Sequence, residues 1–213
     1  MHKYVNLTTQ TSISRYIIKG EKMEILLATN NEGKLKELQN ILTTFTLKTL
    51  KEKNINIDIV EDQQTYEGNA IKKAVHIYNL TNLPTIADDS GLNIHVLNDF
   101  PGIETHRFAG LNATDTERNN IILNKIKNQD NRSAKFTTVL AYYDGYNTII
   151  GKGILNGFIA KNISGTNGFG FDPIFEYAGK TLAQMTQEEK NKISARKLAA
   201  KDLLNNLRKV GIL

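Results

Sequence analysis

The sequence contains no cysteine in 213 residues. The chain therefore has no disulfide framework, no thiolate nucleophile and no cysteine-ligated metal site, which is compatible with a reducing cytoplasm. It also lacks any apolar run that approaches the roughly 20 residues of a membrane-spanning helix. We expect a cytoplasmic protein with no membrane partner.

Basic residues are in excess but form no dense block. The formal net charge is +5 and the sequence pI is about 9.2. Such a balance is compatible with a nucleic acid, an acidic membrane surface or a phosphorylated small molecule. Because the lysines and arginines are interspersed with acids, a solvated surface explains them most simply, and we expect no stable nucleic-acid partner.

Two common catalytic motifs are missing. None of the four histidines has a partner at the spacing of an HExxH metal motif, and we interpret all four as surface or partly buried residues: His2, His76, His95 and His106. No GxSxG motif is present, which removes the commonest sign of a serine hydrolase.

The first 22 residues differ from the rest of the chain. They are polar, lack sustained periodicity and contain no apolar segment long enough for a secretory signal. We expect residues 1–22 to be an N-terminal extension, or to lie upstream of a true start at Met23. Residues 23–213 are expected to form a single domain.

The regular part of the sequence predicts an α/β fold with a mixed sheet. Short apolar runs predict strands, and periodic segments behind capping residues predict helices. Asp144-Gly145 separates two long strands and is a hairpin signal, so that pair is expected to be antiparallel. The predicted strands are 24–28, 85–87, 92–97, 134–143, 147–160 and 173–177, and the predicted helices are 32–42, 66–80, 114–127 and 194–209.

Two adjacent carboxylates, Asp88 and Asp89, interrupt the apolar stretch TIADDSGLNI at 85–94. Asp-Ser-Gly is good turn chemistry, so two solvated turn carboxylates are one interpretation. The apolar flanks favour burial, and a buried carboxylate needs a partner. Strand alternation places the two acids on opposite faces, so we expect one to bind a hard cation in a cleft and the other to hold a turn at Ser90-Gly91.

Three further segments could bind a ligand. Residues 28–38 (ATNNEGKLKEL) pass from a strand into a capped helix with Lys34 in its first turn, an arrangement that suits an anion. Glu67 lies in the first turn of another predicted helix, where a carboxylate is favourable in any case. In residues 164–175 (SGTNGFGFDPIF), glycines allow close approach of the backbone, and Phe169 and Phe171 offer faces for a planar base.

Together these segments resemble the inosine triphosphate pyrophosphatase family, which hydrolyses non-standard purine nucleoside triphosphates. The resemblance extends from about residue 23 to the C-terminal helix. It is carried by TNNEGK at 29–34, IADDSGL at 86–92, PGI at 101–103, GFGFDPIF at 168–175 and EEK at 188–190 followed by Ile193-Ser194. The resemblance implies an elongated mixed sheet flanked by helices, in two lobes with a nucleotide cleft between them.

The resemblance also implies an activity and a set of site residues. ITP, dITP and XTP would be hydrolysed to the nucleoside monophosphate and pyrophosphate, which cleanses the nucleotide pool, and the enzyme would be a homodimer. Asp89 would bind Mg²⁺ together with Glu67 and would be the general base. The substrate would contact Thr29, Asn30, Asn31, Glu32, Gly33, Lys34, Ser90, Phe169, Gly170, Phe171, Asp172, Lys190, Ala195 and Arg196.

Two positions depart from the family pattern. The family usually has Glu before the Asn of its second motif, where this chain has Gly68 and the acid is Glu67; a shift of one residue turns a helical side chain by about 100°. A family histidine near the base is replaced by Ala195, although Arg196 would still donate to a 6-oxo group. Two alternatives stay open: a triphosphate pyrophosphatase of broader or different base specificity, and a catalytically inactive nucleotide-binding sensor.

Overall fold

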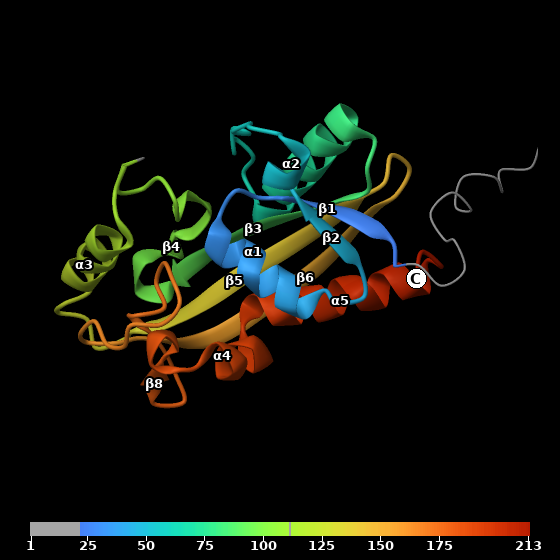
Figure 1. The fold of residues 1–213 in the computed structure, drawn as a ribbon. Coiled ribbons are helices and arrows are strands. Elements are labelled where there is room, and N and C mark those ends of the chain that lie inside the picture. The colour runs from blue at the N-terminus through green and yellow to red at the C-terminus, as the bar shows by residue number, and fades with distance from the viewer. Residues whose placement is uncertain (1–21, 111) are drawn as a thin grey trace, which may run out of the picture.

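The computed structural model describes residues 22–110 and 112–213 (Figure 1). Residues 1–21, almost all of the predicted extension, lie outside the described residues. The strands form one mixed sheet in the order β2-β1-β3-β5-β6-β7-β8, and β4 pairs with β3. Helices flank this sheet, which confirms the predicted fold class.

The elements have the following bounds. The strands are β1 (Glu24–Ala28), β2 (Thr46–Thr49), β3 (Thr85–Ile94), β4 (Phe100–Pro101), β5 (Ser133–Tyr143), β6 (Thr148–Ile159), β7 (Phe175–Tyr177) and β8 (Lys180–Thr181). The α-helices are α1 (Glu32–Ile41), α2 (Tyr66–Thr81), α3 (Asp115–Lys125), α4 (Gln187–Ile193) and α5 (Ala195–Lys209). Within the described residues, no helix is long and apolar enough to cross a membrane.

The sheet is parallel at one end and antiparallel at the other. β1 pairs in parallel with both β2 and β3. β3 then pairs antiparallel with β5, and β5 with β6, so the predicted hairpin at Asp144-Gly145 is confirmed. The parallel strand β2 and the short helix α4 were not predicted, because each carries too few residues for a clear periodic pattern.

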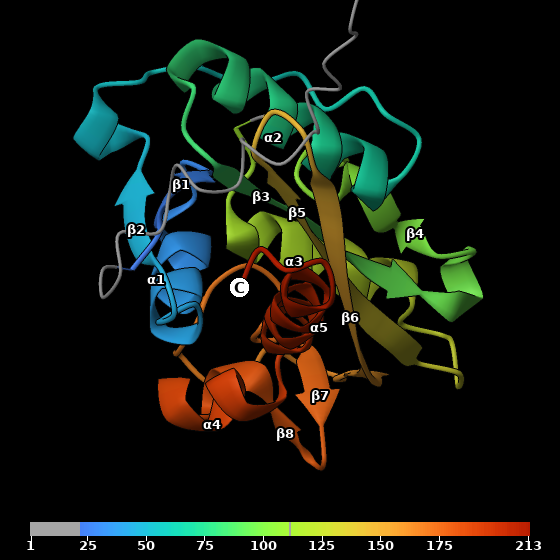
Figure 2. The ribbon, with the colours of Figure 1, turned by 90° about the vertical axis from the view of Figure 1, so that its right-hand side faces the viewer.

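The two faces of the sheet carry different helices. α2 packs on one face, over Leu26 and Ala87, whereas α1 and α5 pack on the other, over Leu27 and Ile86 (Figure 2). α5 lies very close to β6. The glycine at position 153 of β6 allows this approach, since a Cβ there would collide with backbone atoms of the helix. Neighbouring residues of β3 therefore face different helices, as strand alternation requires.

The turn predicted at Ser90-Gly91 does not form. β3 runs without a break from Thr85 to Ile94, and every residue in it pairs with β5. Ten paired residues outweigh the local preference of Asp-Ser-Gly for a turn, and the two acids inside the strand find partners on its two faces. The strand predicted at 92–97 ends early, at Ile94, since residues His95–Leu97 form a 3₁₀ helix.

Candidate functional site

Two cavities adjoin on the sheet. One, of about 490 Å³, lies between α1 and residues 169–172 and contains three phenylalanines; we call it the aromatic cavity. The other, of about 760 Å³, contains Lys34, Lys73, Arg107 and Glu61; we call it the charged cavity. Three residues line both cavities and mark the place where they meet: Asn31, Lys34 and His106.

The segment from Thr29 to Lys34 lies where the cavities meet. Asn31 is the N-cap of α1, and its side-chain oxygen accepts a hydrogen bond from Lys34 N at 3.0 Å. Thr29 Oγ1 in turn accepts from Asn31 N at 3.2 Å. Thr29 and Asn30 line the charged cavity, whereas Glu32 and Gly33 line the aromatic cavity. The positive end of α1 thus points at the boundary between the two cavities.

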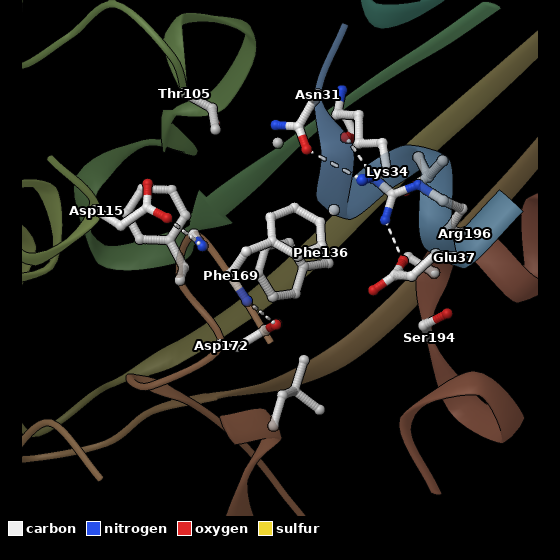
Figure 3. A pocket seen from close by; sticks show the side chains of 18 of the residues that line it. Asn31, Lys34, Glu37, Thr105, Asp115, Phe136, Phe169, Asp172, Ser194 and Arg196 are labelled. Atoms are coloured by element: carbon white, nitrogen blue, oxygen red, sulfur yellow. Dashed lines mark hydrogen bonds and ion pairs between the residues drawn. The ribbon is translucent and has the colours of Figure 1, made fainter. Parts of the chain in front are cut away.

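Six buried charged side chains form a chain beside this segment. In order of contact they are Lys34, Asp88, Arg196, Glu37, Lys190 and Asp172, with cations and anions alternating. Arg196 contacts Glu37 directly, and the other four contacts measure 2.5, 2.6, 2.6 and 2.7 Å. Three positive and three negative charges balance, as burial requires. The chain joins α1, β3, α4 and α5. Figure 3 shows its contact between Arg196 and Glu37.

Arg196 has more partners than the sequence suggested. Its Nε donates to Asp88 Oδ2 at 2.7 Å, its Nη1 contacts Glu37, and its Nη2 donates to Ser90 Oγ at 3.1 Å. Ser90 Oγ also donates to Asp88 Oδ1 at 3.1 Å. A base that accepts a hydrogen bond from Arg196 would therefore share that guanidinium with protein acceptors.

Of the two predicted rings, Phe169 is the one held against cations. Lys190 Nζ lies 4.6 Å from the centre of the Phe169 ring, and Arg196 Cζ lies 5.9 Å from it. Phe171 also lines the aromatic cavity, but it is buried and stacks on Phe108 with 6.3 Å between ring centres. Ala195 lines the same cavity and is buried.

The loop that carries Phe169 is held from two sides. Gly170 N donates to Asp115 Oδ2 at 2.7 Å, and Gly170 O accepts from Asn119 Nδ2 at 3.0 Å. Two side chains of α3 thus bind the backbone N–H and C=O groups of Gly170. Asp172 Oδ2 accepts from Phe169 N at 2.8 Å. Burial raises the pKa of Asp172, although Lys190 opposes the shift. Asp115 and Asn119 were missed, because the sequence showed Asp115 only as the beginning of a capped helix.

Asp89 lies on the opposite face of β3 from Asp88, as predicted. Its Oδ1 accepts from Ser90 N at 3.0 Å and lies 3.7 Å from Lys73 Nζ, whereas its buried Oδ2 has no hydrogen-bond partner among the described residues. Burial raises the pKa of Asp89; Lys73 opposes this shift and Glu61 adds to it. Asp89 is thus a buried carboxylate with one unpaired oxygen; it lines neither cavity itself, whereas Glu61 and Lys73 beside it line the charged cavity.

The pKa of Asp88 shifts in the other direction. Burial alone would raise it, but Arg196 and Lys34 hold the pKa of this carboxyl well below its ordinary value. Asp88 is therefore an ionised member of the buried charge chain. The two adjacent acids differ as expected, but Asp88 joins three elements and does not hold a turn.

Glu67, the second metal ligand predicted, lies away from Asp89. Its carboxylate pairs with Lys152 Nζ of β6 at 2.5 Å, and it lines neither cavity. β6 is two strands from β3 in the sheet. The acid brought to Asp89 is Glu61, whose Oε1 lies 2.5 Å from Lys73 Nζ. The one-residue shift noted in the sequence therefore points Glu67 elsewhere, and a loop acid takes the place beside Asp89.

His106 was interpreted as a surface or partly buried residue, and it is exposed; the structure adds that it lines both cavities, where they meet. The walls of the cavities and the nearby Lys34 ammonium lower the pKa of His106 to about 4, so the imidazole is neutral at physiological pH. Next to it, Arg107 Nη1 donates to Glu61 O at 2.9 Å. No motif in the sequence identified either residue.

The fold and the site define a class of α/β protein in which a mixed sheet carries a cleft with an aromatic and a charged cavity. The chain belongs to the Ham1 family, whose model matches residues 25–206. This membership confirms the family resemblance predicted from the sequence.

Individual relatives match over most of their length. The chain is 40% identical over 193 residues to the dITP/XTP pyrophosphatase of Salmonella typhimurium, covering 87% of this chain and 98% of the relative. It is 41% identical over 199 residues to the dITP/XTP pyrophosphatase of Clostridium perfringens, covering 87% and 97%. The structure of the Staphylococcus aureus Ham1 protein matches with a TM-score of 0.79 and 37% identity, covering 88% of this chain and 99% of that one.

Proposed function

We propose that this protein is a nucleoside triphosphate pyrophosphatase that converts ITP, dITP and XTP to the nucleoside monophosphate and pyrophosphate. The relatives named as dITP/XTP pyrophosphatases support this proposal. The observation that carries it is the pair of adjoining cavities, because a nucleotide needs an aromatic place for its base beside a cationic place for its phosphates. In the reaction, water adds to the α-phosphorus, the bond from that phosphorus to the bridging oxygen breaks, and pyrophosphate leaves.

The aromatic cavity suits a purine that carries oxygen at position 6. Phe169 offers a ring face for stacking, and Lys190 and Arg196 supply hydrogen-bond donors beside it. A 6-oxo group accepts from such donors, whereas the amino group of adenine would place a donor against them. This contact separates ITP and XTP from ATP; the preference over GTP, which also carries a 6-oxo group, is expected from the relatives named as dITP/XTP pyrophosphatases. The same cavity contains Ala195, which leaves room for a broader choice of bases.

The charged cavity suits the triphosphate. The N-terminus of α1 offers backbone N–H groups, and Lys34, Lys73 and Arg107 add positive charge around the same space. Lys34 Nζ contacts Asp88 in the structure, so phosphate binding would draw this ammonium partly away from that carboxylate.

Asp89 and Glu61 fit a magnesium site. Mg²⁺ uses one or two carboxylates, substrate phosphates and water, and the buried Asp89 Oδ2 offers an oxygen with no other partner among the described residues. The described residues contain no cluster of three or more acids, histidines or cysteines, so phosphate oxygens would complete the shell. Bound there, Mg²⁺ would neutralise phosphate charge. Lys73 contacts both acids and would orient them.

Asp89 would also accept the proton of the attacking water. A general base works best when its pKa approaches the working pH, and burial raises the pKa of Asp89. Asp88 would contribute indirectly, by holding Lys34 and Arg196. The homodimer and the cytoplasmic location expected from the sequence remain predictions, and sedimentation of the purified protein tests the first of them.

Release of pyrophosphate from a panel of triphosphates, with and without Mg²⁺, tests the function. We expect ITP, dITP and XTP to be hydrolysed well above ATP and GTP, and only with the metal. Similar rates on all five would favour a pyrophosphatase of broader specificity. Saturable binding without turnover would favour a nucleotide sensor, and neither binding nor turnover would contradict the proposal.

Replacing Gly33 with Ala should weaken base stacking without unfolding the protein. A Cβ at Gly33 would lie 2.5 Å from Phe169 Cδ1, so the ring has to move. Because stacking of a base on an aromatic side chain contributes about 1–3 kcal/mol, we expect kcat/KM for ITP to fall about tenfold. Steady-state kinetics measures this change.

Two further variants check the cause. In the Phe169→Ala background, Gly33→Ala should have almost no additional effect, since the ring that it displaces is absent. Lys36→Ala changes an exposed residue of the same helix and should leave kcat/KM unchanged. Additive losses in the double variant would contradict the displacement of Phe169.

A further inference from the structure

The boundary between the two cavities is the place through which a nucleotide must pass. If the base lies in the aromatic cavity and the phosphates lie in the charged cavity, the pentose lies where the cavities meet. The residues that line both cavities are Asn31, Lys34 and His106. The inference below rests on the proposed function, which supplies the identity of the ligand.

Two of these three side chains are already engaged in the protein. The Asn31 side chain caps α1 by accepting from Lys34 N, and Lys34 Nζ is paired with Asp88 at 2.6 Å. In contrast, no hydrogen bond within residues 22–110 and 112–213 involves the ring of His106. The imidazole is exposed to the cavities, so both of its nitrogens are available to a ligand.

The backbone of His106 is nevertheless held in place. Arg118 Nη2 of α3 donates to His106 O at 3.4 Å, and Arg118 Nη1 pairs with Asp115 at 3.0 Å. Asp115 also holds Gly170 of the Phe169 loop. The first turn of α3 thus links the backbone of His106 to the loop that lines the aromatic cavity.

The cavity walls, together with the charges around the ring, favour the neutral form of His106. Lys34, Lys73 and Arg118 place positive charge near the imidazole, and Glu61 is the acid that opposes them. A neutral imidazole has one N–H donor and one nitrogen acceptor, and a sugar hydroxyl likewise both donates and accepts. Phosphate oxygens only accept, and Lys34, Lys73 and Arg107 around the charged cavity would supply donors to them.

We propose that His106 hydrogen-bonds a hydroxyl of the substrate pentose and is a specificity residue for the sugar. His106 binds the sugar directly and takes no part in proton transfer. It therefore selects nucleotides by their pentose hydroxyls, separately from the selection of the base by Phe169, Lys190 and Arg196.

The test combines a protein variant with a substrate variant. ITP and its 2′,3′-dideoxy analogue are hydrolysed by the wild-type enzyme and by His106→Ala, and kcat/KM is measured for all four pairs. A hydrogen bond contributes about 0.5–1.5 kcal/mol, so we expect His106→Ala to lose about 3- to 10-fold on ITP. On the dideoxy analogue, which has no hydroxyl to bind, the loss should be less than about twofold on the same basis.

Control variants separate sugar binding from a structural effect. His106→Gln retains a donor and an acceptor and should recover part of the loss on ITP. His76→Ala removes the same side chain from α2, outside both cavities, and should leave kcat/KM on both substrates unchanged.

The outcomes divide clearly. Equal losses of His106→Ala on both substrates, or no loss on either, would overturn the sugar contact while leaving the proposed function in place. A wild-type enzyme that hydrolyses neither substrate would overturn the proposed function and the sugar contact together. Melting curves of the variants identify any loss that arises from unfolding.

Discussion

Asp89→Asn is expected to abolish pyrophosphate release from ITP while leaving the protein folded. The amide has the shape of the carboxylate but cannot take the proton of the attacking water, and general-base catalysis contributes about 10²- to 10⁴-fold. Loss of one of the two carboxylates proposed to bind Mg²⁺ would add to this effect. We therefore expect kcat to fall by at least about 10³-fold, measured as pyrophosphate released at saturating ITP and Mg²⁺.

The same variant should be no less stable than the wild type at pH 8. The folded pKa of Asp89 is raised above its ordinary value of 3.8, so its charged form is disfavoured in the folded state. A raised acid pKa makes folding more favourable at low pH and less favourable as pH rises through it. Asn removes this cost, and the melting temperature at pH 8 should stay equal or rise.

Activity of the wild type should also fall on the acid side of neutrality. Asp89 must be ionised to accept a proton, and its raised pKa brings protonation closer to neutral pH than for an ordinary aspartate. Asp62→Asn changes an exposed acid of a surface ion pair and is the matched control, with unchanged rate and pH profile. A rate for Asp89→Asn above about one tenth of that of the wild type would contradict the role of Asp89 as base.

The different roles of Asp88 and Asp89 could be predicted because they depend on strand alternation alone. The period of two holds wherever a strand continues, and β3 continues through both residues. The predicted turn failed for the opposite reason. Turn preference is local, whereas pairing with β5 depends on residues about fifty positions further along the chain, which no local pattern shows.

The partner of Asp89 illustrates what the sequence could not show. Glu61 lies in an irregular segment without a motif, and it reaches Asp89 through Lys73, whose helix begins after that segment. Some residues that line the aromatic cavity were likewise not identifiable from the sequence. Phe136 of β5 and Leu155 of β6 line it, although both read as ordinary strand residues. Such sites depend on tertiary packing, which local periodicity does not encode.

The buried charge chain predicts the largest effect on stability, from Asp88→Asn. This change leaves Lys34 and Arg196 buried with one negative charge fewer between them, and removing one partner of a buried pair costs about 3–5 kcal/mol. We expect the free energy of unfolding in urea at pH 7 to fall by about that amount. Asp62→Asn, which removes an exposed partner of Lys72, should leave the free energy of unfolding almost unchanged.

The dependence on pH gives this prediction its sharpest test. The folded pKa of Asp88 lies well below its unfolded value, so its stabilisation is present above about pH 4 and is lost as pH falls toward the folded pKa. The gap in stability between wild type and Asp88→Asn should therefore narrow below about pH 4. A constant gap, or a loss no larger than that of Asp62→Asn, would contradict the proposed role. Because Asp89→Asn should instead keep its fold and lose its activity, adjacent residues on opposite faces of one strand separate stability from chemistry.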